Sequence, residues 1–275
     1  MVLFTGELRS ARFGQSTLPA VGSHRTAALS LAELGNFVEG RSMGEDAVRI
    51  AEAAEQPFSI AMALMTVGVV YYRLGDIHTV VPVLERGLVL CQTANFPRLV
   101  PLTASFLGAA YALTGRIAEA CPILDQTLKR VATGSSMLFH TLVLTGLSEA
   151  LFFVGRMDEA GALAERLLNL FHTHIGRGYQ AHACRLLGEI AAHRHPPEVE
   201  KAQAHYCQAL TLAQELGMRP LLAHCHRGLG MLYAQRGLRE QAHTELSAAI
   251  TMYRSMDMTF WLRQMGATLA QEEAR

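Results

Sequence analysis

The sequence predicts an all-α fold in which helical hairpins of about 40 residues follow one another as a solenoid. Glycines stand at positions 35, 75, 115 and 155, with 40 residues between neighbours. A string of the form Leu/Val-Gly-x-x-Tyr recurs at residues 67–71, 107–111 and 229–233. Apolar or small residues four apart recur in the same phase at 80–84, 120–124, 160–164, 202–206 and 242–246. Recurrence at a fixed period of this length is the signature of a repeat architecture.

Each repeat predicts two helices, because apolar residues recur at spacings of three and four on both sides of the glycine. A glycine that closes the first helix adopts the left-handed conformation, where a side chain costs free energy. We expect that conformation at Gly75, Gly115, Gly155 and Gly237. We expect the glycines of the second string, Gly68, Gly108, Gly188 and Gly230, to face Ala120, Ala160, Ala202 and Ala242 across closely packed helices.

Two prolines and one long step refine this phase. Pro82 and Pro122 each lie seven residues past a turn glycine, so we expect them in the first turn of a second helix, where proline is tolerated. The step from Gly188 to Gly230 is 42 residues, and the two extra residues are expected in a loop at residues 195–197.

The period divides the chain into six units and two end segments. The units are approximately 21–60, 61–100, 101–140, 141–180, 181–222 and 223–257. Residues 1–20 are interpreted as a degenerate N-terminal half-unit. Residues 258–275 are expected to form a C-terminal capping helix, whose Trp261 would shield the last repeat.

These strings resemble the tetratricopeptide repeat (TPR) over about residues 21–257. The Leu-Gly-x-x-Tyr string, the turn glycine and the small residue followed by x3-Leu carry the resemblance. It implies a TPR-like solenoid wound as a right-handed superhelix. HEAT and armadillo repeats have similar lengths but lack the fixed glycine and tyrosine spacing.

Composition excludes several classes of protein and partner. Half of the residues are hydrophobic and 17% are charged, which is typical of a folded chain and excludes disorder. Twenty-four basic and twenty-four acidic residues leave no net charge, so neither nucleic acid nor a membrane is expected as a partner. Five scattered cysteines and the lack of a signal or membrane-spanning pattern predict a cytoplasmic protein.

The amino-acid sequence of the later repeats resembles the C-terminal TPR tail of bacterial multidomain signalling ATPases related to class III adenylate cyclases. The segments that carry this resemblance are 219–226, 252–258 and 178–189. The family's catalytic activity is not carried over, because the sequence contains no GxxxxGK[ST] phosphate loop. The resemblance implies a regulatory or interaction role in a bacterial signalling protein.

In a TPR array the first helix of each hairpin lines the concave groove. That register predicts a partner-binding groove that is apolar toward the N-terminus and ionisable toward the C-terminus. Its residues are Met65, Val69, Tyr72, Ala109, Leu113, Glu149, Phe152, His182, Arg185, Glu189, His224 and Arg227. Two alternatives stay open: the apolar members are core residues, and Arg185, Glu189 and Glu149 form only an ion-pair ladder.

No catalytic, cofactor or metal site is predicted. The histidine pairs 172/174, 193/195 and 224/226 are two residues apart, so on a helix each pair faces two directions and cannot hold one ion. Cys184, Cys207 and Cys225 fall where the repeat expects small buried residues. No nucleophile elbow is present.

The sequence therefore favours a non-catalytic scaffold that binds a peptide or protein segment in its groove. The alternative is a small-molecule sensor domain of a signal-transduction ATPase or transcription regulator. A third hypothesis is self-association through the uncapped N-terminal end.

Overall fold

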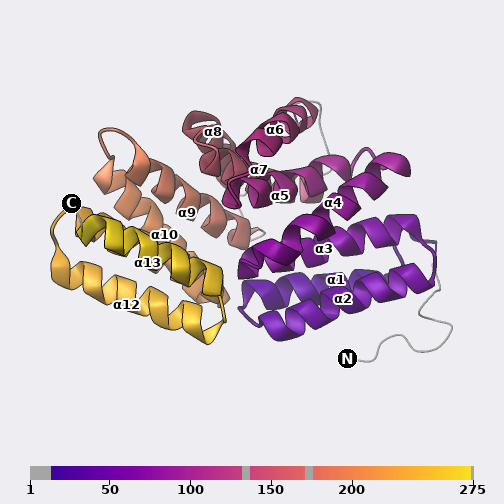
Figure 1. Ribbon diagram of the computed structural model, residues 1–275, viewed down its shortest axis with the longest axis horizontal. Coiled ribbons are helices and arrows are strands. Elements are labelled where there is room, and N and C mark those ends of the chain that lie inside the picture. Colours follow the sequence, from indigo (N-terminus) through magenta and orange to yellow (C-terminus); the bar gives the residue numbers. More distant parts are fainter. Residues whose placement is uncertain (1–13, 132–136, 171–175, 274–275) are drawn as a thin grey trace. The chain divides into compact units, whose positions relative to one another are not determined.

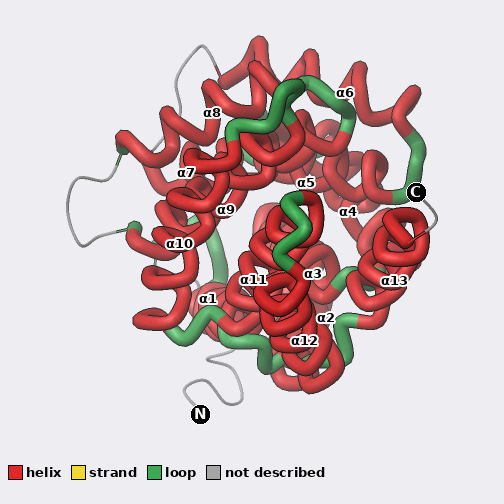
Figure 2. Tube along the Cα trace, turned by 90° about the vertical axis from the view of Figure 1, so that its left-hand side faces the viewer, coloured by secondary structure: helices red, strands yellow, loops and turns green. Residues whose placement is uncertain are grey.

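The fold is all-α and TPR-like in the computed structural model, which describes residues 14–131, 137–170 and 176–273. Those residues form thirteen helices and no strand (Figures 1 and 2). The helices are α1 (Pro19–Glu33), α2 (Phe37–Ala53), α3 (Pro57–Leu74), α4 (Ile77–Thr93), α5 (Val100–Leu113), α6 (Ile117–Val131), α7 (Met137–Phe153), α8 (Met157–Asn169), α9 (Arg177–His193), α10 (Val199–Leu216), α11 (Arg219–Gln235), α12 (Arg239–Ser255) and α13 (Thr259–Glu273).

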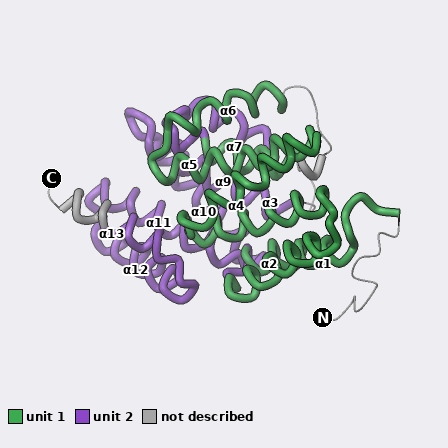
Figure 3. The backbone as a smooth tube through the Cα atoms, turned by 45° about the vertical axis from the view of Figure 1, so that its right-hand side comes forward, with its two compact units in different colours: residues 1–32, 36–150 green, residues 33–35, 151–275 purple. Residues whose placement is uncertain are grey.

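The chain divides into two compact units (Figure 3). Unit 1 comprises residues 1–32 and 36–150, and unit 2 comprises 33–35 and 151–275. In unit 1 the hairpins α3/α4 and α5/α6 are each packed internally, and α2 and α4 pack on the helix that follows. In unit 2 the hairpins α9/α10 and α11/α12 follow the same scheme, with α8 on α9 and α13 on α12. We call the odd-numbered helices α1 to α11 the first helices of their hairpins.

The turn glycines are confirmed. Gly75, Gly115, Gly155 and Gly237 have φ values of 85°, 76°, 81° and 72°, in the left-handed region. Gly75 ends α3, and its backbone N–H donates to the carbonyls of Tyr71 and Tyr72. A left-handed glycine at Gly217, between α10 and α11, was not predicted. The 195–197 segment lies in the α9–α10 loop, as expected from the long step.

The expected partners of the buried glycines were wrong. A Cβ added at Gly68 would lie 2.4 Å from Leu84, and one at Gly108 would lie 2.5 Å from Leu124. Gly108 therefore faces Leu124, four positions after Ala120, and not Ala120 itself. Gly68 faces Leu84 in the same register. The physical reason is packing of a branched side chain against bare backbone, which brings the two helices of a hairpin together.

The expected position of the two prolines was also wrong. The second helix begins two residues after the turn glycine, at Ile77 in α4 and Ile117 in α6, so Pro82 and Pro122 lie inside their helices. A proline there supplies no N–H to the carbonyl four residues earlier. In α4 the carbonyl of His78 therefore receives no helical hydrogen bond from residue 82.

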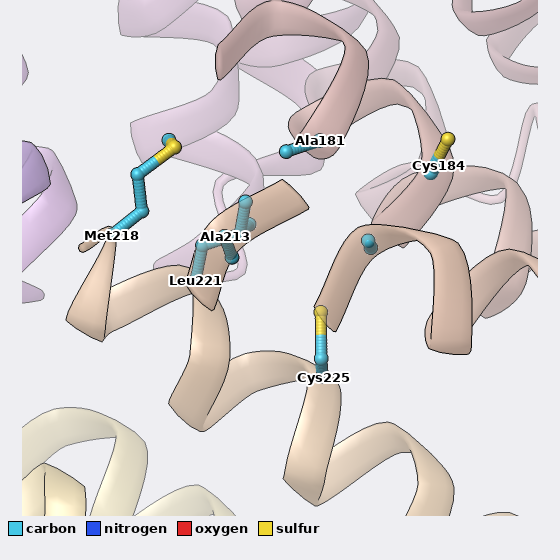
Figure 4. Close-up of a cluster of buried hydrophobic side chains, with 7 residues drawn as sticks. Ala181, Cys184, Ala213, Met218, Leu221 and Cys225 are labelled. Atoms are coloured by element: carbon cyan, nitrogen blue, oxygen red, sulfur yellow. The ribbon is translucent and has the colours of Figure 1, made fainter. Parts of the chain in front are cut away.

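Small side chains and sulfur dominate one core cluster of unit 2. Ala181 and Cys184 of α9 meet Ala209 and Ala213 of α10 and Leu221 and Cys225 of α11 (Figure 4). Cys184 and Cys225 are buried as expected, whereas Cys207 is exposed. Position 207 follows the fully buried Tyr206 and lies on the outer side of α10, so the expectation for Cys207 was wrong.

Helix α3 is the one helix in the described ranges that is long and apolar enough to cross a membrane. In the folded chain 72% of its apolar window is buried. Burial of this extent is what a core helix of a repeat shows, since both neighbouring helices cover it.

The two end segments were expected to be a half-unit and a capping helix. Most of the half-unit 1–20 lies outside the described residues, and α1 begins at Pro19. At the other end Trp261 of α13 is 7% exposed, and its ring meets His224 of α11 edge-on at a centroid distance of 4.7 Å.

Candidate functional site

Buried polar side chains gather on the first helices. Of the thirteen that are buried in the described parts of the chain, all except Thr127 lie on α3, α5, α7 or α9. They are Ser59, Thr66, Thr103, Ser105, His140, Thr141, Thr145, Ser148, Glu149, His182, Arg185 and Glu189. Burial of a polar group costs free energy unless it is hydrogen-bonded. Several of the hydroxyls donate to carbonyls of their own helix, as Thr66 does to Met62 and Thr145 does to Thr141. The charged Glu149 and Glu189 are instead paired with side chains of other helices.

In unit 1 the structure brings together two helices that are far apart in sequence. The Tyr72 hydroxyl of α3 donates to Glu149 Oε2 of α7 at 2.9 Å, and Arg73 Nη1 lies 3.4 Å from the same oxygen. Tyr72 and Glu149 are 4% and 3% exposed. The negative charge of Glu149 is thus held by donors from within its own unit.

The apolar residues predicted to line the groove in unit 1 are mostly buried. Met65, Val69 and Ala109 are no more than 3% exposed, in agreement with the core alternative. Leu113, at the end of α5, is half-buried. A ligand of unit 1 could therefore contact Leu113 but not these buried side chains.

In unit 2 an ionic cluster joins two first helices. Arg227 Nη2 of α11 donates to Glu189 Oε1 of α9 at 2.7 Å, and Arg185 Nη1 lies 3.8 Å from that oxygen. Burial alone would raise the pKa of Glu189, but the charges of Arg227, Arg185 and His193 hold it below its ordinary value. Burial likewise opposes the charged form of Arg227, but the Glu189 carboxylate keeps the pKa of Arg227 above its ordinary value. Both shifts favour the ionised forms of Glu189 and Arg227.

Aromatic rings extend this cluster toward α12 and α13. His224 Nδ1 and the Tyr253 hydroxyl share a hydrogen bond of 2.7 Å, and the Arg227 guanidinium lies 5.8 Å from the centre of the Trp261 ring. His224 and Arg227 are half-buried. The buried indole Nε1 of Trp261 has no hydrogen-bond acceptor among the described residues.

The remaining predicted residues of unit 2 lie on α7 and α9. Phe152 is half-buried and meets the ring of His193 edge-on at 5.4 Å. His182 is buried on α9, 6% exposed. Arg185 and Glu189 are a ladder pair as the alternative stated, but the shorter contact of Glu189 runs to Arg227 of another helix.

Arg25 of α1 was not among the residues predicted from the sequence to line the groove. Its Nε–H donates to the carbonyl of Met62 at 3.0 Å and to Thr66 Oγ1 at 2.8 Å, both on α3. Arg25 lies ten residues before Gly35, as Met65 lies ten before Gly75 and Arg227 lies ten before Gly237. The repeat register could therefore have placed Arg25 in the groove.

Among the described residues no group of three histidine, cysteine, aspartate or glutamate side chains could hold a metal ion. The pair His172 and His174 lies outside those residues. The pair His224 and His226 diverges as expected of residues two apart: His224 meets Tyr253, and His226 Nδ1 lies 2.6 Å from Glu245.

Comparison with known proteins supports the repeat. The family model of the tetratricopeptide repeat matches residues 101–126, which span α5 and most of α6. No curated protein matches the sequence.

Two solved structures share the fold. BtubC (BKLC) from P. vanneervenii superposes with a TM-score of 0.52 at 19% identity, over 82% of this chain and 92% of that one. The Rap conjugation gene regulator of plasmid pLS20, in complex with the Phr* peptide, superposes with a TM-score of 0.65 at 14% identity. That match covers 87% of this chain, which spans 63% of the Rap chain. At these identities the likeness concerns the fold.

Proposed function

We propose that this chain is a non-catalytic interaction module whose first helices bind a peptide or protein segment. The observation that carries the proposal is the concentration of buried polar side chains on those helices. Helices that only filled a core would be more stable with apolar residues at these positions. A buried charged group such as Glu189 holds the partly exposed side chain of Arg227 in one orientation, which suits recognition of an extended segment.

The comparisons support this proposal through the Rap regulator, whose structure contains a bound peptide. The resemblance of the later repeats to tails of bacterial signalling ATPases supports a regulatory setting. We propose that the module is a regulatory part of such a signalling protein.

The residues proposed to contact the segment are those of the predicted groove that keep accessible surface. In unit 2 they are Phe152, His224 and Arg227. The buried members have an indirect role. Glu189 fixes the guanidinium of Arg227, and Tyr253 fixes the ring of His224.

Panning a phage-displayed library of random peptides on the purified chain tests the function. We expect a consensus peptide that binds the wild-type chain and binds Phe152→Ala about tenfold more weakly, as loss of one aromatic contact predicts. Leu216→Ala is the control, because Leu216 is an exposed apolar residue of unit 2 that lies on the second helix α10, outside the predicted groove. Circular dichroism of both variants establishes that they are folded.

Absence of any enriched peptide would contradict the proposal. In that case a metabolite that raises the melting temperature would favour the small-molecule sensor.

A further inference from the structure

Arg25 is a cation of unit 1 that is oriented by neutral groups. Its Nε–H is shared between the carbonyl of Met62 and the hydroxyl of Thr66. Thr66 is itself buried, and its hydroxyl also donates to the Met62 carbonyl at 3.0 Å. One edge of the Arg25 guanidinium is therefore held against α3 by a fixed pair of acceptors.

No carboxylate compensates this cation within the described residues. Each described ion pair involves other groups, and burial is the only influence on the Arg25 pKa, which it lowers to about 10. Arg73 of the same unit shows the contrast, because it lies 3.4 Å from the Glu149 carboxylate. Removing an arginine from water without a counter-charge costs free energy, so an uncompensated Arg25 lowers the stability of the free protein.

The remaining edge of the guanidinium is available to a ligand. The two hydrogen bonds to α3 use Nε, and neither terminal nitrogen donates to another described residue. Arg25 is half-buried, so solvent reaches part of the side chain. A guanidinium held in one plane presents parallel N–H donors that match the two oxygens of a carboxylate.

The neighbourhood favours a singly charged anion. The equivalent positions of the next two repeats hold Met65 and Ser105, which are buried and neutral. A single cation beside neutral residues suits one carboxylate better than a phosphate dianion, which is usually bound by several donors or cations.

We propose that Arg25 is the site in unit 1 that binds a carboxylate of the ligand. The inference deepens the proposed function and rests on it for the source of the carboxylate, which is either the C-terminus of a peptide or an aspartate or glutamate side chain. The hydrogen bonds to Met62 and Thr66 orient the guanidinium, and the ligand supplies the missing counter-charge.

Acetate is a probe that tests the site without a peptide. In protein labelled with 15N-arginine, we expect the Arg25 Nε signal to shift with acetate and to saturate in the millimolar range. Arg98 is the internal control, since it is an exposed arginine of unit 1. The Arg25 signal is assigned by its absence from Arg25→Met. A non-saturating shift equal to that of Arg98, or saturation by inorganic phosphate at a lower concentration than acetate, overturns the proposal.

Peptide pools then identify the source of the carboxylate. Three pools of acetylated hexapeptides are compared: one without aspartate and glutamate but with a free C-terminus, the same pool amidated, and an amidated pool that contains aspartate and glutamate. We expect one of the two carboxylate-bearing pools to bind, and to bind Arg25→Met about tenfold more weakly, as loss of one charge-assisted pair predicts. Arg98→Met should bind as the wild type does.

The two proposals fail separately. Peptides that bind the wild type and Arg25→Met equally well overturn the role of Arg25 and leave the interaction module standing. Acetate binding at Arg25 with no peptide bound by any pool overturns the interaction module and leaves the anion site standing. Arg25→Lys, which keeps the charge but not the fork, should recover only part of the affinity.

Discussion

The hydroxyl of Tyr111 donates a hydrogen bond of 2.7 Å to Glu85, and Tyr71 donates one of 2.6 Å to Glu45. Both pairs are 26 residues apart, and in both the glutamate lies on the second helix of one hairpin and the tyrosine on the first helix of the next. The tyrosine of the repeat string thus ties neighbouring hairpins together. A solenoid whose repeats touch only their neighbours depends on such ties.

Tyr111→Phe should destabilise unit 1 by about 1 kcal/mol, the typical loss for one hydrogen bond. Urea unfolding followed by circular dichroism measures the change. Val89→Ala is a suitable control, because Val89 is an exposed residue of the same unit. An unchanged midpoint for Tyr111→Phe would show that the tie carries no stability.

The same residue predicts a loss of stability in alkali. Burial, followed by the hydrogen bond and charge of Glu85, raises the pKa of Tyr111 from 10.0 to about 12. The folded state therefore favours the neutral phenol. The stability contributed by this shift is complete below pH 10 and is lost as the pH rises toward 12. Melting temperatures across that range should fall more steeply for the wild type than for Tyr111→Phe.

Glu189→Gln should destabilise unit 2 by about 3 kcal/mol, because it leaves Arg227 and Arg185 without their carboxylate. The double variant Glu189→Gln/Arg227→Met should recover part of that loss, since it removes one of the two positive charges that Glu189 neutralises. Chemical unfolding of the single and double variants measures both effects. A double variant no more stable than Glu189→Gln would contradict the assigned coupling.

Gly228→Ala should be among the most damaging small substitutions. A Cβ there would lie 2.4 Å from the ring of Tyr206, which is 1% exposed and meets Gly188 of α9 on another side. A rigid buried ring cannot yield, so we expect a loss of about 2 kcal/mol. Gly266→Ala in α13 is the matched control: no atom lies within 4 Å of the added Cβ, and helix propensity predicts a gain of about 0.5–1 kcal/mol. Equal effects in thermal melts would rule out the packing argument.

The cysteines should differ sharply in reactivity toward Ellman's reagent. Cys207 is exposed, whereas Cys184 is buried and burial raises its pKa to about 11. Only the thiolate reacts, so the native protein should show a fast phase that Cys207→Ser removes. A fast phase whose amplitude is unchanged in Cys207→Ser would contradict the exposure of that residue.

Local sequence patterns are sufficient to predict the period, the turn glycines and the all-α class, because each of these depends on local geometry. A glycine with positive φ and an apolar stripe of helical spacing can both be recognised from residues that are close together in the sequence. The sequence shows that Pro82 and Pro122 occupy equivalent positions of two repeats, but it does not specify the residue at which each helix begins.

Which side chains are buried, and which partners they meet, depends on how the helices pack. Glu149 and Tyr72 are separated by 77 residues, and Glu189 and Arg227 by 38, so no local pattern specifies that they meet. The same holds for Arg25: the register marks its position, but only the packing of α1 on α3 shows that neutral acceptors hold it and that no described carboxylate neutralises it. Burial and pairing are properties of the stacked repeats, since each helix acquires its environment from hairpins encoded elsewhere in the chain.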